Sequence, residues 1–163
     1  MIEQQIDRLA ANLANGLQQQ GLSLAVAESC SGGWLAKVLT DVPGCSAWFL
    51  GGVVSYSNAA KQRLLSVDHD CLQEFGAVSE PVARQMVVGV CAAFSSNLGV
   101  SITGVAGPAG GTADKPVGMV CFAVQNSRGE VLAITQCFDG DREQVRLQAV
   151  AFALSLLLEA VAD

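Results

Sequence analysis

Basic residues are scarce in this chain. Its 163 residues include nine Lys plus Arg against fifteen Asp plus Glu, which gives a formal net charge of −6, and the cations form no run. A protein that binds nucleic acid neutralises backbone phosphates with clustered lysines and arginines. The sequence therefore argues against nucleic acid as a partner.

Histidine and metal-binding patterns are nearly missing too. The one histidine, His69, stands in a polar segment away from every glycine-rich turn, which argues against a Ser-His-Asp triad. The six cysteines are scattered, with no Cys-x-x-Cys pair and no histidine at metal spacing. We expect reduced thiols, no metal and no cofactor.

Uninterrupted apolar runs are short. We find no apolar segment of the roughly 18 to 20 residues that span a bilayer, and no signal-peptide core at the N-terminus. A cytoplasmic protein without a membrane partner is expected. The composition, 51% apolar and 15% charged, is typical of a well-packed chain, and its length suits a single domain over residues 1–163.

Hydrophobic periodicity predicts alternating helices and strands. Helices are expected over 2–20, 31–41, 79–95 and from 141 onward, with short ones after 58 and 68; strands are expected over 22–28, 48–57, 98–102, 117–124 and 131–138. Ser31 and Asn58 are the expected N-caps of the second and third helices. The pattern predicts an α/β fold, a three-layer α/β/α sandwich on a mixed, mostly parallel sheet with a C-terminal antiparallel hairpin.

The most informative stretch runs from Leu22 to Lys37. An apolar strand leads into Glu28-Ser-Cys-Ser-Gly-Gly33, and helical periodicity begins at Trp34. The first N–H groups of a helix have no intrahelical partner and carry about half a positive charge, so this turn can bind an anion. A plain strand-to-helix connection explains the same pattern.

Ligands of α/β sheets sit beyond the carboxyl ends of the strands. Three polar segments should converge there: 28–33, 55–61 and 103–116. The last, TGVAGPAGGTADKP, is neither a Walker A nor a GxGxxG motif. It can supply backbone N–H donors, and Thr103 a hydroxyl, although a flexible surface loop is the alternative.

Ser29 or Ser31 with Lys61 is a chemically coherent nucleophile and base. A lysine serves as the base if desolvation or positive potential lowers its pKa from about 10.4 toward 7 or 8. Tyr56, five residues before Lys61, can relay a proton or orient the amine. Ordinary strand packing explains it equally well.

Cys30 is a rival nucleophile, because a helix N-terminus also depresses the pKa of a thiol. Strand alternation, however, directs Glu28 and Cys30 to one face and Ser29 to the other. One of the two neighbours should therefore face the core.

Arg142 and Arg146 lie one turn apart at the start of the last predicted helix, where the helix dipole disfavours cations. Two explanations remain open. Either a bound phosphate offsets the charge, or acidic neighbours do so, namely Asp139, Asp141 or Glu143.

Several motifs resemble the CinA C-terminal domain family. They are AESCSGG at 27–33, VSYSNAAK at 54–61, GAVSEPVA at 76–83, SITGVAGPAGG at 101–111, KPVGMV at 115–120 and GDR at 140–142. The resemblance runs in order from about residue 5 to 160. The family's usual AESCTGG has threonine where this chain has Ser31, which keeps the hydroxyl.

The resemblance implies hydrolysis of the carboxamide of nicotinamide mononucleotide to nicotinic acid mononucleotide and ammonia, in pyridine-nucleotide recycling. The family's serine and lysine map onto Ser29 and Lys61, with Tyr56 nearby. The candidate substrate-binding residues are Glu28, Ser31, Gly32, Gly33, Asn58, Thr103, Gly104, Ala106, Gly107 and Arg142. We expect a homodimer. The alternatives are a nucleotide- or phosphate-binding regulatory module without turnover and a serine amidase acting on another small amide.

Overall fold

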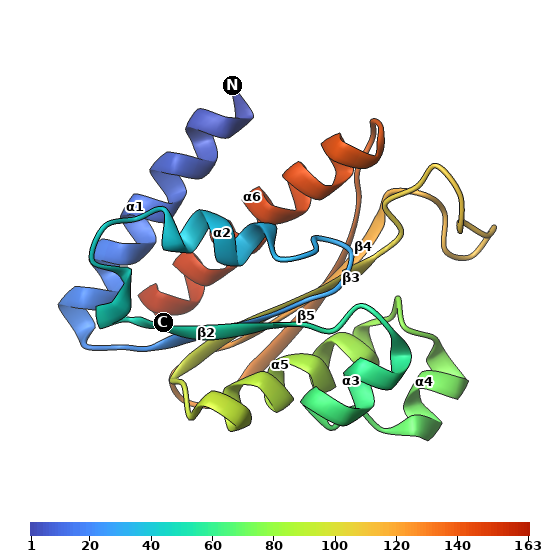
Figure 1. Cartoon of the computed structure of the whole chain (residues 1–163), viewed down its shortest axis with the longest axis horizontal. Coiled ribbons are helices and arrows are strands. Elements are labelled where there is room, and N and C mark those ends of the chain that lie inside the picture. Colours follow the sequence, from blue (N-terminus) through green and yellow to red (C-terminus); the bar gives the residue numbers. More distant parts are fainter.

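The computed structural model describes residues 1–163 and has a five-stranded sheet at its centre, in the order β2-β1-β3-β4-β5 (Figure 1). The strands are β1 (Leu24–Glu28), β2 (Phe49–Val54), β3 (Leu98–Gly104), β4 (Met119–Gln125) and β5 (Val131–Cys137). β1 pairs in parallel with β2 and β3, whereas β4 is antiparallel to β3 and β5. Only β4 therefore runs against the others, which confirms the mixed sheet and its C-terminal hairpin.

Helices cover both faces of the sheet (Figure 1). One layer contains α1 (Ile2–Gln20), α2 (Trp34–Thr40) and α6 (Arg142–Ala162), and the other contains α3 (Asn58–Leu65), α4 (His69–Phe75) and α5 (Glu80–Phe94). A short 3-10 helix, Cys45–Ala47, precedes β2. Each layer encloses its own apolar core, of 29 buried residues beneath α1, α2 and α6 and 14 on the other side. The predicted α/β/α sandwich is confirmed.

Two adjacent glycines in β2 allow a bulge and a close approach to β1. The β1–β2 register shifts where Leu24 pairs with Phe49 and the next residue of β1 pairs with Gly51, so β2 has a bulge. At Gly52, an added Cβ would lie 2.7 Å from the Val26 side chain. This close approach lets β2 pack onto the fully buried strand β1.

Two predicted N-caps are wrong. α2 begins at Trp34, three residues later than expected, with Gly33 at φ 95° as its N-cap in place of Ser31. Gly32 and Gly33 both adopt positive φ, which ends any helical path through the turn. α3 is capped by Ser57, whose hydroxyl accepts the Ala60 N–H, and not by Asn58.

Helix α6 corrects the expectation that no segment is apolar enough to span a membrane. It reaches that length and composition, but more than half of its apolar window is buried inside the fold. Residues such as Ala149, Leu154 and Leu157 are buried, and α6 packs on α1 and β3. Its apolar character is that of a core helix enclosed on several sides.

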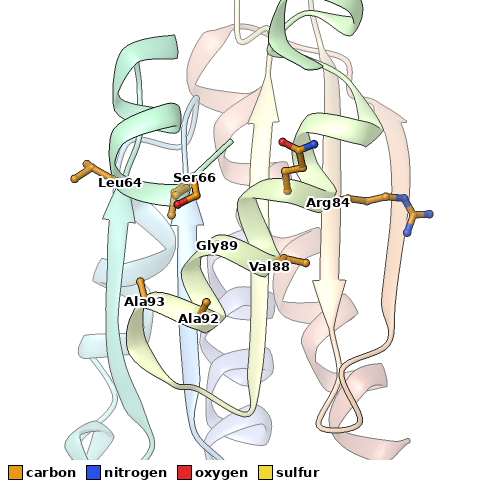
Figure 2. A pocket seen from close by; sticks show the side chains of 9 residues that line it. Leu64, Ser66, Arg84, Val88, Gly89, Ala92 and Ala93 are labelled. Atoms are coloured by element: carbon orange, nitrogen blue, oxygen red, sulfur yellow. The ribbon is translucent and has the colours of Figure 1, made fainter. Parts of the chain in front are cut away.

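An open groove of about 580 Å³ lies between the end of α3 and the outer face of α5 (Figure 2). Its lining is mostly apolar: Leu64, Leu65, Ser66, Arg84, Gln85, Val88, Gly89, Ala92 and Ala93. At Gly89 an added Cβ would overlap the Leu65 carbonyl, so glycine lets α5 approach α3 closely. The groove lacks a nucleophile paired with a base. The homodimer and the cytoplasmic location expected from the sequence stay predictions.

Candidate active site

The carboxyl ends of β1, β2 and β3 place the 28–33 and 55–61 segments side by side. Ser29 follows β1 directly, and its N–H donates to the Ile102 carbonyl of β3 at 2.9 Å. The Ser55 N–H donates to the Glu28 carbonyl at 2.8 Å, which ties the end of β2 to the end of β1. These backbone bonds hold the nucleophile candidate next to the start of α3, where Lys61 lies.

Lys61 and Ser29 are in direct contact. The Nζ of Lys61 lies 2.9 Å from the Oγ of Ser29, 2.7 Å from the Ser55 carbonyl and 3.2 Å from the Tyr56 carbonyl. A neutral amine has two N–H groups and one lone pair. When the two carbonyls accept the two N–H groups, the lone pair faces the Ser29 hydroxyl. This is the geometry of a base that is ready to accept the serine proton.

Burial tunes the Lys61 amine. The side chain is only 1% exposed, and desolvation lowers its pKa to about 8. No carboxylate opposes this shift, because the ion pairs of the structure are Lys37–Asp41 and Arg128–Glu130. With this pKa about a tenth of the amines are neutral at pH 7. Desolvation by burial is thus the main cause of the lowered pKa.

Cys30 does not have the properties of an activated nucleophile. Its side chain lies in the core beneath α1, α2 and α6, and burial raises the pKa of the thiol to about 11. The expected depression of this pKa by the helix N-terminus is wrong. The predicted alternation holds, because Cys30 faces the core and Ser29 faces Lys61.

Glu28 occupies the helix N-terminus that the sequence offered to a ligand. Its buried carboxylate accepts the Leu35 N–H at 2.9 Å through Oε1 and the Ala36 N–H at 3.0 Å through Oε2. The protein's own anion therefore satisfies the first turn of α2. This end of α2 is not an open anion site, and Glu28 is enclosed inside the protein, where it caps α2.

Replacing Glu28 by glutamine should weaken the fold. The amide keeps the shape, but its NH2 group would face one of the two N–H donors, which leaves a buried donor unpaired. We expect the free energy of unfolding to fall by about 1–3 kcal/mol in urea denaturation. Glu159→Gln, on an exposed position of α6, is the matched control and should stay within about 0.5 kcal/mol of the parent. Equal urea midpoints for Glu28→Gln and Glu159→Gln would show that the stability of the fold does not depend on the two hydrogen bonds of Glu28.

Two turns near Ser29 carry free backbone donors. The N–H groups of Cys30, Ser31 and Gly33 donate to no backbone carbonyl, and neither do those of Ala106 and Gly107. Either set is available to an oxyanion or a phosphate.

The other candidate residues differ in what their polar atoms already contact. The Ser31 hydroxyl is buried without a partner, whereas the Thr103 hydroxyl donates to the Ala77 carbonyl at 2.9 Å. Gly104 ends β3 against β4. Asn58 is exposed at the first turn of α3. Of these four, only Ser31 has an enclosed polar atom that is left free.

Arg142 joins the 103–116 loop to the rim of the site. Its Nη1 donates to the Gly107 carbonyl at 2.7 Å, and its Nη2 lies 3.5 Å from the Tyr56 hydroxyl. The Tyr56 side chain is 62% exposed, so the backbone carbonyl of this residue, and not the phenol, contacts Lys61. Asp139, Asp141 and Glu143 form no ion pair with Arg142. Asp141 is nevertheless the N-cap of α6 and Glu143 lies in its first turn, where a negative charge offsets the cations without a direct contact, so the explanation by acidic neighbours stays a prediction.

Sequence reasoning missed two parts of this site. The Ser55 carbonyl accepts from Lys61, and the Arg146 guanidinium donates to the carbonyls of Cys30 and Ser31. Backbone carbonyls have no residue-type signature, so only the position of residues 55–56 at a strand end pointed to them. The i, i+4 spacing of the two arginines was the one available sign of Arg146.

A buried serine–lysine pair at the carboxyl edge of a mixed sheet defines this molecule as an α/β protein with a Ser–Lys site. The model of the CinA C-terminal domain matches residues 6–161, and the chain belongs to that family. This confirms the resemblance found in the motifs.

Similar proteins cover nearly the whole chain. The nicotinamide-nucleotide amidohydrolase PncC of Escherichia coli K12 is 46% identical over 157 residues, which are 96% of this chain and 95% of that protein. The protein of the same name from Enterobacter agglomerans is 47% identical over 158 residues, 97% and 96% of the two chains. The competence/damage inducible protein CihA of Agrobacterium tumefaciens superposes with a TM-score of 0.93 at 39% identity, covering 98% of this chain and 96% of that one.

Proposed function

We propose that this chain hydrolyses the carboxamide of nicotinamide mononucleotide to nicotinic acid mononucleotide and ammonia, in the recycling of pyridine nucleotides. Near-full-length identity of 46% and 47% to two nicotinamide-nucleotide amidohydrolases supports the amidohydrolase class. The observation that carries the proposal is the 2.9 Å contact between the Ser29 Oγ and the Lys61 Nζ. It provides the nucleophile and the base that acyl transfer from an amide needs.

The first step of the proposed reaction forms a tetrahedral intermediate. The neutral Lys61 amine accepts the Ser29 proton while Oγ bonds to the carboxamide carbon, and the carbonyl oxygen becomes an oxyanion. Free backbone N–H groups of the 30–33 turn or of residues 106–107 stabilise that oxyanion. The carbonyls of Ser55 and Tyr56 accept N–H groups of the newly formed ammonium and so stabilise it.

The following steps pass through an acyl-enzyme and release both products. Protonated Lys61 returns its proton to the amide nitrogen, the C–N bond breaks and ammonia leaves. Lys61 then takes a proton from water, whose oxygen attacks the ester carbon. The bond between that carbon and the Ser29 Oγ breaks, protonated Lys61 returns a proton to Oγ, and the acid product gives its remaining proton to solvent as the carboxylate. We assign the direct transfer to Lys61 and place the Tyr56 phenol at the rim, beside Arg142, as a contact for the bound substrate.

Arg142 is the proposed ligand of the substrate phosphate. Its guanidinium borders a cavity of about 470 Å³ beside Ala106 and Pro108, and it has donors beyond the two that contact Gly107 and Tyr56. Arg142→Ala should raise KM for the nucleotide about 10- to 100-fold with a smaller change in kcat. The KM of Arg142→Ala for the nucleoside, which lacks the phosphate, should equal that of the parent. The control Arg8→Ala, at an exposed position of α1, should keep the parent KM for the nucleotide. An equal rise in KM for nucleotide and nucleoside would remove Arg142 as the phosphate ligand.

Ammonia release from nicotinamide mononucleotide tests the proposed function directly. Stoichiometric ammonia and nicotinic acid mononucleotide are expected. Binding without turnover would support the regulatory module instead. Faster turnover of an unrelated small amide, in competition with the nucleotide, would identify the chain as a serine amidase of different specificity.

A further inference from the structure

Arg146 holds the nucleophile turn from the side of α6. Its Nε donates to the Cys30 carbonyl at 3.1 Å and its Nη2 to the Ser31 carbonyl at 3.2 Å. The guanidinium carbon also lies 5.3 Å from the centroid of the Trp34 ring. At Gly32 an added Cβ would approach Nη2 to 3.2 Å, so glycine leaves room for this contact. The side chain is thereby fixed by three neighbours of the turn.

The two carbonyls determine where the attached N–H groups point. In a trans peptide unit the C=O and the following N–H point in opposite directions. The Ser31 carbonyl shares its peptide unit with the Gly32 N–H, which donates to the Ser29 carbonyl at 3.1 Å and so closes the turn. The Cys30 carbonyl shares its peptide unit with the Ser31 N–H, which donates to no backbone acceptor. Arg146 therefore directs the free Ser31 N–H away from α6.

The proposed reacting groups, Ser29 and Lys61, lie on the side of the turn that faces away from α6. α6 lies on one face of the sheet, whereas α3, which carries Lys61, lies on the other (Figure 1). The Ser29 hydroxyl contacts Lys61, so it also faces away from α6. The free Ser31 N–H and the nucleophile thus point to the same side of the turn. A cation on the Cys30 carbonyl also polarises that peptide unit and strengthens its N–H as a donor.

We propose that Arg146 is a positioning residue that aims the Ser31 N–H at the oxyanion formed when Ser29 attacks its substrate. This inference rests on the proposed function and adds to it a choice between the two glycine turns. The 30–33 turn, held by Arg146, stabilises the oxyanion. The Gly107 loop, held by Arg142, lies toward the phosphate.

Arg146→Lys tests the proposal, because lysine keeps the charge but not the paired, planar donors. We expect kcat for nicotinamide mononucleotide to fall about 10- to 100-fold, with KM changed by less than about threefold. The same fall is expected for the nucleoside that lacks the phosphate. Arg84→Lys is the matched control and should keep the parent rate, since Arg84 on α5 also donates to a backbone carbonyl, that of Val131, away from the site.

A second measurement separates this inference from the identity of the substrate. Phenylmethanesulfonyl fluoride sulfonylates an active serine: the Oγ–S bond forms, fluoride leaves and the serine proton passes through Lys61 to solvent. Mass spectrometry measures the rate, which Arg146→Lys should lower by about the same factor. The Ser31 amide resonance should also move in this variant, even where its melting temperature is close to that of the parent.

Each contrary result has a defined meaning. An unchanged kcat and sulfonylation rate in Arg146→Lys would overturn the inference, and a KM effect confined to the nucleotide would make Arg146 a phosphate ligand instead. If the parent reacts with the sulfonyl fluoride but releases no ammonia, the proposed substrate is wrong and the sulfonylation rates decide the role of Arg146. If the parent does neither, the Ser29 mechanism and this inference fall together.

Discussion

Ser29→Ala is expected to lower kcat for ammonia release by at least about 10³-fold. The substitution removes the oxygen that forms the acyl-enzyme, and no second nucleophile contacts Lys61 through its side chain. Lys61 keeps the carbonyls of Ser55 and Tyr56 as partners, so the free energy of unfolding should change by only about 1 kcal/mol. Single-turnover kinetics and urea denaturation measure the two effects separately.

The neighbouring Cys30→Ala variant provides the control. Its thiol lies in the core and stays protonated, so its removal should leave kcat within a few-fold of the parent. Activity that survives in Ser29→Ala and disappears in Cys30→Ala would transfer the role of nucleophile to the cysteine.

The layers of the fold could be predicted because they follow from local periodicity. β1 reads as a continuous apolar run and is buried along its whole length, as a central parallel strand must be. Ser79 caps α5, with Pro81 close behind it, and Asp141 caps α6 in a capping box with Gln144, so both helices begin beside the expected positions 79 and 141. In each case the deciding contacts lie within a few residues of one another.

The start of α2 could not be predicted because a distant side chain decides it. The turn of Gly32 and Gly33 delays the helix, and Glu28 then reaches its first N–H groups from seven and eight residues away. A sequence reading placed Ser31 there because serine is a common cap. The same tertiary dependence applies to α6, whose apolar length reflects burial on several sides.

The pairing of Ser29 with Lys61 was accessible from the residue inventory. The chain has one histidine and three lysines, and only Lys61 lies in a segment that follows a strand end and was expected to meet the 28–33 turn. Two other contacts depend on how α3 and α6 pack against the sheet, which no local pattern encodes. They are the hydrogen bond of Lys61 to the Ser55 carbonyl and that of Arg146 to the Cys30 carbonyl. The inventory thus suggested which side chains meet, whereas docking determines how their atoms are directed.

Lys61→Met is expected to lower kcat/KM at pH 7 by at least about 10³-fold, because methionine fills the space but accepts no proton. The parent enzyme should show a matching pH profile. Burial lowers the pKa of Lys61 to about 8, and the active form is the neutral amine. The value of log kcat/KM should therefore rise by about one per pH unit below pH 8 and level off above it.

The loss of that slope in Lys61→Met is the decisive part of the test. A residue that only supported the Ser29 turn would lower the rate without changing its dependence on pH, whereas removal of the base removes the ionisation itself. Lys37→Met, on an exposed position of α2, should retain both the rate and the slope. A parent profile that falls between pH 6 and 8, or a Lys61→Met variant that retains the rise, would mean that another group accepts the Ser29 proton. The Ser29 hydroxyl and the carbonyls of Ser55 and Tyr56 would then bind a Lys61 side chain that stays protonated throughout the reaction.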